Sequence, residues 1–160
     1  MNLLIKTNNV GCKSGWTRFT IGGQVKSLKR IGVYELQEAK SRCAECGASV
    51  PLPRNRNENE DYRVAFEELV SGYDVALGLN DVANEGVWLD NNDKRVPYTN
   101  WGSGEPDNYN GNQDYVSMYM ALWGKWFDGR ATTTSSIVCE KESSSRALFI
   151  SAFILVWVIA

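Results

Sequence analysis

The 160-residue sequence contains no histidine, and this absence excludes several classes of active site. Serine and cysteine hydrolases most often use histidine as their general base, and zinc enzymes most often use it as a metal ligand. The net charge is also small, at −2, so the chain lacks the basic surplus expected of a nucleic-acid-binding protein. The length suits one domain with a sizeable core. A functional site must therefore be built from other residue types.

A long apolar run is missing from the N-terminus. The segment MNLLIKTNNV has three consecutive apolar residues, too few for the apolar centre of a secretory signal peptide. Residues 147–160, ALFISAFILVWVIA, are by contrast uncharged and follow serines at 143–145. As a helix rising about 1.5 Å per residue, they are too short to cross a bilayer core of about 30 Å. A lipid-anchor signal, a membrane-associated tail and an artefact of gene prediction all remain open for this segment.

Cysteine is present at only four positions, 12, 43, 46 and 139, which allow three fully paired connectivities. Cys43 and Cys46 form a C-x-x-C motif, a spacing used by redox and metal-binding pairs. No second C-x-x-C and no histidine accompanies it, so zinc binding is disfavoured. Widely separated cysteines in a loop-rich chain favour structural disulfides and an oxidising compartment.

The rest of the chain is organised around the segment Tyr98–Asp114, YTNWGSGEPDNYNGNQD, in which glycine, proline and asparagine prevent a regular helix or strand. Within ten residues it holds the acidic and amide side chains of Glu105, Asp107, Asn108, Gln113 and Asp114. Such a group repels itself unless it is neutralised, and Ca²⁺ takes about 6–8 oxygen ligands of this kind. A cis peptide bond at Pro106 would aim Glu105 and Asp107 at one point. We expect a calcium-binding loop here; the alternative is a solvated polar loop.

Hydrophobic periodicity predicts two helices and several short strands. The helices cover Glu35–Cys46 and a stretch from the N-cap Asn55 to Gly72, where Glu58 completes a capping box. The expected strands are Trp16–Ile21, Val25–Leu28, Val75–Leu79, Gly86–Leu89, Tyr115–Trp123, Trp126–Phe127 and Ser136–Cys139. The residues expected in the core are Leu36, Phe66, Leu79, Trp88 and Trp101. This order indicates an α+β fold with a mainly antiparallel sheet.

Six motifs then occur in a characteristic order: GASVPLPRN, NENEDY, ALGLNDVANEGVW, VPYTNWGSGEPDN, WFD and IVCEK. Together they resemble the C-type lectin-like domain, and within it the carbohydrate-recognition domain of mannose-binding collectins, over Trp16–Glu140. The resemblance implies a C-type lectin-like fold, with two helices flanking small antiparallel sheets and a long calcium-binding loop. It divides the chain into an N-terminal extension (1–15), the lectin-like domain (16–142) and a Ser-rich linker with a hydrophobic tail (143–160).

The resemblance also implies a principal Ca²⁺ site whose ligands bind sugar hydroxyls. The positions that match the family's ligands are Glu105, Asp107, Gln113 and Asp128. Two positions depart from the family pattern: Gln113 stands where a Glu is usual, and Phe127 stands where an Asn ligand is usual. Glu-Pro-Asp is a hybrid of the mannose-type and galactose-type motifs, and we weakly favour mannose-type sugars. Tyr109 is the candidate for stacking on a sugar ring.

An accessory calcium site is implied by the same resemblance. Its matching residues are Asp81, Glu85, Asn108 and Asp114. The family's long disulfide would join Cys43 to Cys139, and Tyr115 and Ala131 occupy the positions of its second, loop-side bridge. Cys12 and Cys46 have no standard partners in the family, and we expect them to pair with each other.

Three functions are compatible with this sequence. The favoured one is a calcium-dependent module that binds glycans or glycoproteins, secreted or attached to the cell surface, with the hydrophobic tail as a possible membrane attachment. The alternative is a lectin-like domain that binds a protein, with calcium structural or absent, which Gln113 and Phe127 favour. A glycosidase using paired carboxylates is least favoured, because nothing else in the sequence indicates a reaction. We expect no enzymatic activity and no nucleic-acid partner.

Overall fold

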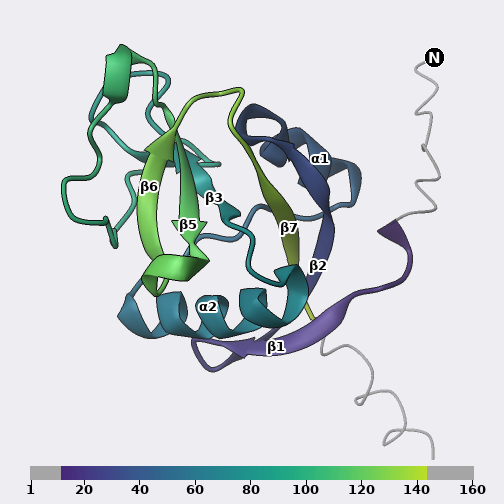
Figure 1. Ribbon diagram of the computed structural model, residues 1–160. Helices are drawn as coiled ribbons and strands as arrows, with labels where there is room; N and C mark the ends of the chain where they lie inside the picture. Colours follow the sequence, from purple (N-terminus) through teal and green to yellow (C-terminus); the bar gives the residue numbers. More distant parts are fainter. Residues whose placement is uncertain (1–11, 144–160) are drawn as a thin grey trace, which may run out of the picture.

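The computed structural model describes residues 12–143, in which two helices and three short 3₁₀ turns surround one twisted sheet (Figure 1). The expectations for residues 1–11 and for the hydrophobic tail at 147–160 lie outside the described residues. None of the helices formed by residues 12–143 has the length and apolar character needed to span a membrane.

Seven strands make up the sheet: β1 (Thr17–Ile21), β2 (Gln24–Glu35), β3 (Val75–Asn80), β4 (Leu89–Asp90), β5 (Tyr115–Tyr119), β6 (Lys125–Gly129) and β7 (Thr134–Glu142). They are hydrogen-bonded in the order β1-β2-β7-β3-β5-β6, and β4 pairs with β3. All pairs are antiparallel except β3 with β7. The predicted α+β fold with mainly antiparallel pairing is therefore confirmed.

The long pairing of β2 with β7 joins the two ends of the domain. Its register runs from Lys26 opposite Glu142 to Glu35 opposite Thr134, with one irregularity at Arg30–Gly32. The sequence predicted only Val25–Leu28 as a strand, because the following Lys, Arg and Gly interrupt the apolar alternation. Backbone hydrogen bonds to β7 extend this strand well beyond its apolar part.

The first predicted helix is confirmed as a 3₁₀ turn, η2 (Leu36–Glu38), that leads into α1 (Ala39–Glu45). Gly47 ends it as expected: its φ of +61° is a conformation that glycine adopts without a steric cost. Leu36 and Cys43 are buried on its inner face, where they contact β7 and the end of the sheet.

The second predicted helix, α2 (Arg56–Val70), is capped by Asn55, whose side chain accepts the Glu58 N–H at 2.9 Å. The predicted capping box is only half correct. The Glu58 carboxylate accepts the backbone N–H of Arg54 at 2.8 Å instead of that of Asn55. Asn55 is fully extended, so the chain enters the helix from a direction that brings the preceding N–H within reach. Gly72 and the preceding Ser71 end the helix in left-handed conformations.

Two predicted strands have different bounds in the structure. The prediction of a strand at Gly86–Leu89 was wrong, since only Leu89–Asp90 pairs with β3. The Gly86 N–H instead donates to the Asp81 carboxylate at 2.8 Å, which holds this segment as a turn. The predicted strand Tyr115–Trp123 ends at Tyr119, where the chain enters the 3₁₀ turn η4 (Met120–Leu122). A φ of +56° at Trp123 then reverses the chain into β6.

The hydrophobic core lies between α2 and one face of the sheet. Tyr62, Ala65 and Phe66 of α2 are at most 1 % exposed. They face buried strand residues that include Leu28, Leu79, Met118, Trp126 and Val138. Of the predicted core residues, Leu36, Phe66 and Leu79 are fully buried, while Trp88 and Trp101 are partly buried and pack against the core edge. Their ring centroids lie 4.9 Å apart.

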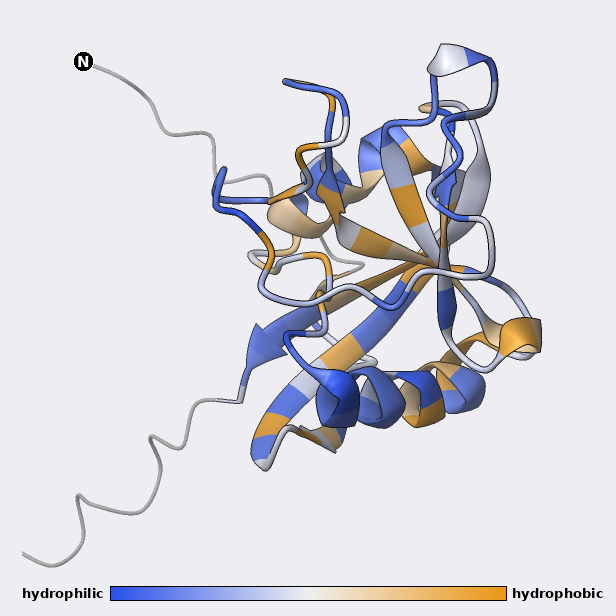
Figure 2. Ribbon diagram, turned by 90° about the vertical axis from the view of Figure 1, so that its left-hand side faces the viewer, coloured by the Kyte–Doolittle hydropathy of each residue, from blue (hydrophilic) through white to orange (hydrophobic). Residues whose placement is uncertain are grey.

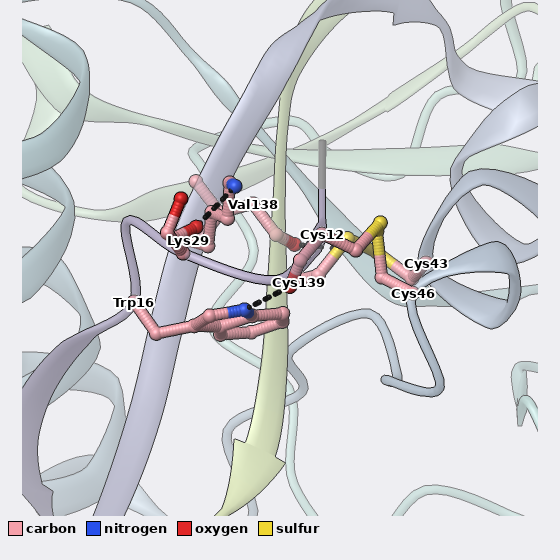
Figure 3. The surroundings of a disulfide bond; sticks show 8 residues. Cys12, Trp16, Lys29, Cys43, Cys46, Val138 and Cys139 are labelled. Carbon is pink, nitrogen blue, oxygen red and sulfur yellow. Dashed lines mark hydrogen bonds between the residues drawn. A yellow bond between two sulfur atoms is a disulfide. The ribbon is translucent and has the colours of Figure 1, made fainter. Parts of the chain in front are cut away.

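Two disulfides meet on α1 (Figure 3). Cys43 is bonded to Cys139 of β7, and Cys46 is bonded to Cys12, so both expected pairings are confirmed. The Trp16 indole N–H donates to the carbonyl of Cys12 at 2.7 Å and fixes the segment that carries this cysteine. The C-x-x-C motif therefore serves two structural cross-links.

The Cys43–Cys139 bond is expected to stabilise the fold more than Cys12–Cys46. It closes a sequence separation of 96 residues and is fully buried, whereas the other bond closes 34 residues and is partly exposed. Replacing Cys43 and Cys139 by alanine should lower the free energy of unfolding by about 4–5 kcal/mol, from loop entropy and the cavity left behind. Urea denaturation measures this loss. A larger loss in the matched Cys12→Ala/Cys46→Ala variant would contradict this ranking.

Candidate functional site

The candidate site is formed by the polar loop of residues 91–114, between β4 and β5, and by the strand β6 beneath it. Figure 2 shows that this loop is hydrophilic over most of its length, in contrast to the alternating strands. Two backbone hydrogen bonds of 2.9 Å join it to β6, from Gly102 N–H to the Trp126 carbonyl and from Trp126 N–H to the Asn100 carbonyl. The Glu105–Pro106 peptide bond is cis, which is the isomer expected to aim Glu105 and Asp107 at one point. The loop is therefore anchored at its centre on a buried strand.

The start of the loop is held by Asp90, a residue that none of the sequence motifs singles out. Its carboxylate accepts the N–H groups of Asn92 and Lys94 at 2.8 and 3.1 Å and pairs with the Arg54 guanidinium at 3.0 Å. The repeated Asp and Asn residues of the segment LDNNDK are the signal that was available, because such side chains often hydrogen-bond to backbone N–H groups two residues on.

The structure brings three of the four expected principal ligands together. Single carboxylate oxygens of Glu105, Asp107 and Asp128 all lie within 4.8 Å of one another. Asp128 is buried on β6, Glu105 is partly buried, and Asp107 is exposed in the loop. A set of close carboxylates that reaches the surface at Asp107 has the oxygen chemistry that a hard divalent cation requires.

Asp128 connects this group to the backbone of the loop. Its Oδ1 accepts the Asp107 N–H at 3.2 Å, and its Oδ2 accepts the Asn108 N–H at 2.8 Å. These charge-assisted hydrogen bonds fix the loop segment that carries Asp107 relative to β6. Asp128 is therefore both an anchor for the loop and a member of the carboxylate group.

Glu105 has the most perturbed carboxyl group of the cluster. Burial raises its pKa to about 7, and the hydrogen bond to Asp128 and the charges of Asp128 and Asp107 add to this increase. A cation placed among these oxygens would favour the charged form and reverse the effect. The mutual repulsion of the three carboxylates therefore favours the binding of a positively charged ligand.

Gln113 lies beside this cluster, but its amide is engaged within the protein. Its Nε2 donates to the Asp128 carbonyl at 3.0 Å, and its Oε1 accepts the Tyr109 N–H. Asn108 is engaged in the same way, since its Oδ1 accepts the Gln113 N–H at 3.1 Å. Tyr109 itself is 63 % exposed at the tip of the loop, next to Asp107, whose carboxylate also accepts its N–H.

Phe127 occupies the strand position between Trp126 and Asp128. Its ring stacks on Tyr119 of β5, with the centroids 4.3 Å apart. It also lies directly beneath the loop: a Cβ atom on Gly102 would come within 2.6 Å of the ring, so only glycine fits there. Phe127 supplies an apolar support for the loop where the family pattern has an amide ligand.

The expected accessory residues lie where β3 leaves the sheet. Asp81 is 2 % exposed; its Oδ2 accepts the Gly86 N–H, while its Oδ1 has no hydrogen-bond partner among residues 12–143. Burial raises the pKa of Asp81 to about 6, and the nearby charges of Glu85 and Asp114 contribute. Asp114 also accepts the Asp81 N–H through its carbonyl at 3.1 Å. Asn108, expected in this set, contacts the principal cluster instead, through Asp128 and Gln113.

A buried carboxylate oxygen that has no hydrogen-bond partner is more stable beside a cation than without one. Leaving such an oxygen unsatisfied costs about 1–3 kcal/mol, and more when the group is charged. The charges of Glu85 and Asp114 act on Asp81, so a cation is a suitable partner for its free oxygen, although within residues 12–143 these three carboxylates gather less closely than the principal group.

Comparison with known proteins finds this fold among lectins. The family model described as "Lectin C-type domain" matches residues 33–141. The mouse scavenger receptor C-type lectin carbohydrate-recognition domain is 24% identical with a TM-score of 0.67, covering 79% of this chain and 95% of its own.

Two further solved structures share the fold. The cow carbohydrate-recognition domain of CD23, solved in the presence of GlcNAc2Man3 oligosaccharide, is 20% identical with a TM-score of 0.68, covering 83% of this chain and 97% of that one. The C-type lectin CEL-I from Cucumaria echinata is 22% identical with a TM-score of 0.66, covering 72% and 89%. At these identities, the likeness establishes the fold.

The ion-free protein is expected to become less stable as pH rises from about 4 to about 8. The folded-state pKa values of Glu105 (about 7) and Asp81 (about 6) lie above their ordinary values of 4.5 and 3.8. The folded protein therefore binds more protons than the unfolded chain in this window, and the stabilisation present at low pH is lost as pH rises through the raised values.

Thermal unfolding in chelator at several pH values measures this dependence. The Glu105→Gln and Asp81→Asn variants should each show a shallower fall than the unmodified protein, whereas Glu68→Gln, at an exposed position on α2, should not. Identical pH profiles in all four proteins would show that these carboxyl groups do not carry the effect.

Proposed function

This chain belongs to the C-type lectin domain family, and on that premise we propose that it is a calcium-dependent carbohydrate-binding module with a weak preference for mannose-type sugars. The observation that carries the proposal is the convergence of Glu105, Asp107 and Asp128, whose carboxylate oxygens lie within 4.8 Å of one another beside an anchored loop. Asp128 of β6 joins the two loop residues here, so that three carboxylates face one another.

The principal site would hold Ca²⁺ through Glu105, Asp107 and Asp128. When bound, the ion supplies open coordination positions for sugar hydroxyls. The protein's part is to position the ligands: Asp128 fixes the loop backbone, and Phe127 supports the loop from below. Gln113 would contribute its carbonyl oxygen only after giving up its hydrogen bond with the Tyr109 N–H. This engagement supports a calcium affinity below that of a site with five available ligands.

A second Ca²⁺ would bind near Asp81, Glu85 and Asp114; Asn108 would join it only after its side-chain oxygen gives up the hydrogen bond with the Gln113 N–H. The free oxygen of Asp81 and its raised pKa support this assignment. Since Asp114 and Asp81 are joined through the backbone, an ion here would also stabilise the end of the loop. By residue type this accessory site matches the family pattern better than the principal one, whereas within residues 12–143 the principal carboxylates lie closer together.

The sugar would lie against the open side of the principal cluster. Glu105 and Asp107 are acceptors only, so they suit hydroxyl groups that donate. The exposed ring of Tyr109 stands beside Asp107 and is placed to contact a sugar ring. The cow CD23 domain was solved with a mannose-containing oligosaccharide, which supports the mannose-type preference by analogy.

The domain boundaries and cellular location are part of the same proposal. We assign residues 16–142 to the lectin domain, in line with the family match to residues 33–141 and with β7, which ends at Glu142. The two disulfides support an extracellular protein, secreted or held at the cell surface, that binds glycans or glycoproteins without catalysing a reaction.

A second candidate function is recognition of a protein ligand with calcium structural or absent. The specific observation in its favour is that Gln113 and Phe127 are both committed to internal contacts. In this alternative the principal site holds no ion, and calcium at the accessory site is structural or also absent.

The Glu105→Gln variant separates the two functions. Removing one charged ligand should weaken calcium binding at the principal site by about tenfold, or about 1.4 kcal/mol, because calcium affinity follows the number of charged ligands. Calorimetric calcium titration and retention on mannose and galactose resins, with and without chelator, measure the effect. Glu68→Gln is the matched control and should retain full binding. Retention that survives chelator, or no retention on either resin, would contradict the sugar-binding proposal.

Phe127→Asn is expected to strengthen calcium and mannose binding by about tenfold, because it returns an oxygen ligand to the cluster. The variant also loses the stacking contact with Tyr119, which should lower the thermal midpoint. Tyr119→Ser removes the same stack without adding a ligand to the cluster and is the control for this loss. If Phe127→Asn gains no affinity over Tyr119→Ser, the fifth ligand position has been rebuilt for another purpose.

A further inference from the structure

A groove of about 670 Å³ lies between the start of α2 and the turn that joins η4 to β6. Its lining residues are Arg56, Asn57, Asn59, Glu60, Tyr98, Asn100, Trp123 and Lys125. None of these residues belongs to either calcium cluster. Figure 1 places η4 just above α2, at the opposite end of the molecule from the turn η3 (Tyr109–Gly111) at the tip of the long loop. The volume lies within the range of about 300–1,000 Å³ typical of small-ligand sites.

The floor of the groove is rigid. Asn59 is 4 % exposed; its amide donates to the Gly124 carbonyl at 3.3 Å and accepts the Trp126 indole N–H at 2.8 Å. Asn100 donates to the same Gly124 carbonyl at 2.8 Å. Three segments distant in sequence are thereby fastened to one another, so the groove exists before any ligand arrives.

Positive charge gathers on the walls of this groove, although the whole chain has a net charge of −2. Within residues 12–143, Arg56 and Lys125 take part in no ion pair. The Lys125 ammonium only donates to the Asn100 side chain at 3.1 Å, and Arg56 lies near the Tyr98 hydroxyl. The one acidic residue of the lining, Glu60, pairs with Arg63, which also pairs with Glu67. The groove therefore presents two cations that form no ion pair with a carboxylate of residues 12–143.

Trp123 lines the same groove with 81 % of its surface exposed. Its φ of +56° is a left-handed conformation that is unfavourable for a bulky side chain and mild for asparagine or glycine. The Arg63 guanidinium lies 5.9 Å from the centre of its ring and helps to orient the indole. Neither core packing nor the turn itself explains an aromatic residue at this position.

We propose that this groove is a second, calcium-independent binding site for a saccharide that carries a sulfate or carboxylate group. The indole of Trp123 provides an apolar face for a sugar ring. Arg56 and Lys125 provide charge-assisted hydrogen bonds to the anion, and Asn57, Asn100 and Tyr98 provide donors and acceptors for hydroxyl groups. The combination of one aromatic face, two cations and several neutral polar groups within a short groove suits a charged sugar.

Calorimetric titration of the full chain in excess chelator tests this site apart from the calcium-dependent one. The probes are a sulfated chondroitin tetrasaccharide, its desulfated counterpart and neutral chitotetraose. The sulfated probe should bind one-to-one in chelator, with unchanged affinity in the Glu105→Gln variant. Loss of binding on desulfation assigns the anion as sulfate, whereas retained binding assigns it as the uronate carboxylate. Equal binding of the neutral probe, or loss of binding in chelator, would overturn the proposal.

Three variants locate the binding to this groove. Trp123→Asn should weaken it by about tenfold or more, because it removes the indole from a position where asparagine is conformationally acceptable. Lys125→Gln should weaken it by about fivefold or more, since it removes one charged donor. Lys40→Gln, an exposed lysine on α1, is the matched control and should bind normally. If Trp123→Asn binds as tightly as the unmodified protein, the proposal is contradicted. The same holds if Lys125→Gln and Lys40→Gln lose equal affinity, because the binding would then reflect general charge attraction.

The Trp123→Asn variant remains informative because it should fold normally. Its thermal midpoint should equal or exceed that of the unmodified protein, since an exposed residue in a left-handed conformation is being replaced by one better suited to it. Arg56→Gln, at the exposed first position of α2, provides an independent substitution in the same groove, and its full retention of affinity would count against the site.

Discussion

The site depends on one buried carboxylate, that of Asp128. It is held by the hydrogen-bonded strand β6, and it holds in turn two consecutive backbone N–H groups of a loop that has almost no regular structure. Charge-assisted hydrogen bonds are among the stronger contacts available to a surface loop. A change in the charge of Asp128 would therefore alter the position of Asp107 together with its own ability to bind a cation. The position of the loop and the binding of a cation therefore both depend on the Asp128 carboxylate.

The carboxylates around Asp128 repel one another. Glu105 has a raised pKa because it is partly buried and faces two other acids, and Asp81 shows the same effect at the end of β3. Such groups are costly in an ion-free protein and become favourable beside a cation. The fold thus places unfavourable charge at Glu105 within the long loop and at Asp81 beside the end of that loop at Asp114, and a cation at each position would relieve it. Functional sites are a common location for this kind of stored electrostatic cost.

Local sequence patterns predicted most of the fold. The cap of α2, its apolar face and the glycine after α1 depend on neighbouring residues, and all were found as expected. The strand predicted at Gly86–Leu89 failed because the Asp81 side chain competes for the Gly86 N–H, an interaction that periodicity does not register. The length of β2 was underestimated for a similar reason, since its pairing with distant β7 overrides its mixed composition.

The acidic residues of the principal cluster could also be identified from the sequence, but their surroundings could not. The resemblance marked Gln113 and Phe127 as departures from the family without showing what they contact. Only the structure shows that the Gln113 amide is occupied by backbone groups and that Phe127 fills the space under Gly102. The groove at Trp123 was missed entirely, because its lining comes from three separate segments whose residues are unremarkable when read in order.

The pairing of β2 with β7 has a consequence for how the domain would be presented. Ser143 donates its N–H to the Val25 carbonyl at 3.3 Å, and Cys12 is bonded to α1, so both ends of the described chain are fastened on the side away from the long loop (Figure 1). A tether attached at either end would leave the loop facing outward, free of steric shielding. Several domains joined in this way would direct their loops toward one surface, and weak single contacts would then add into avidity.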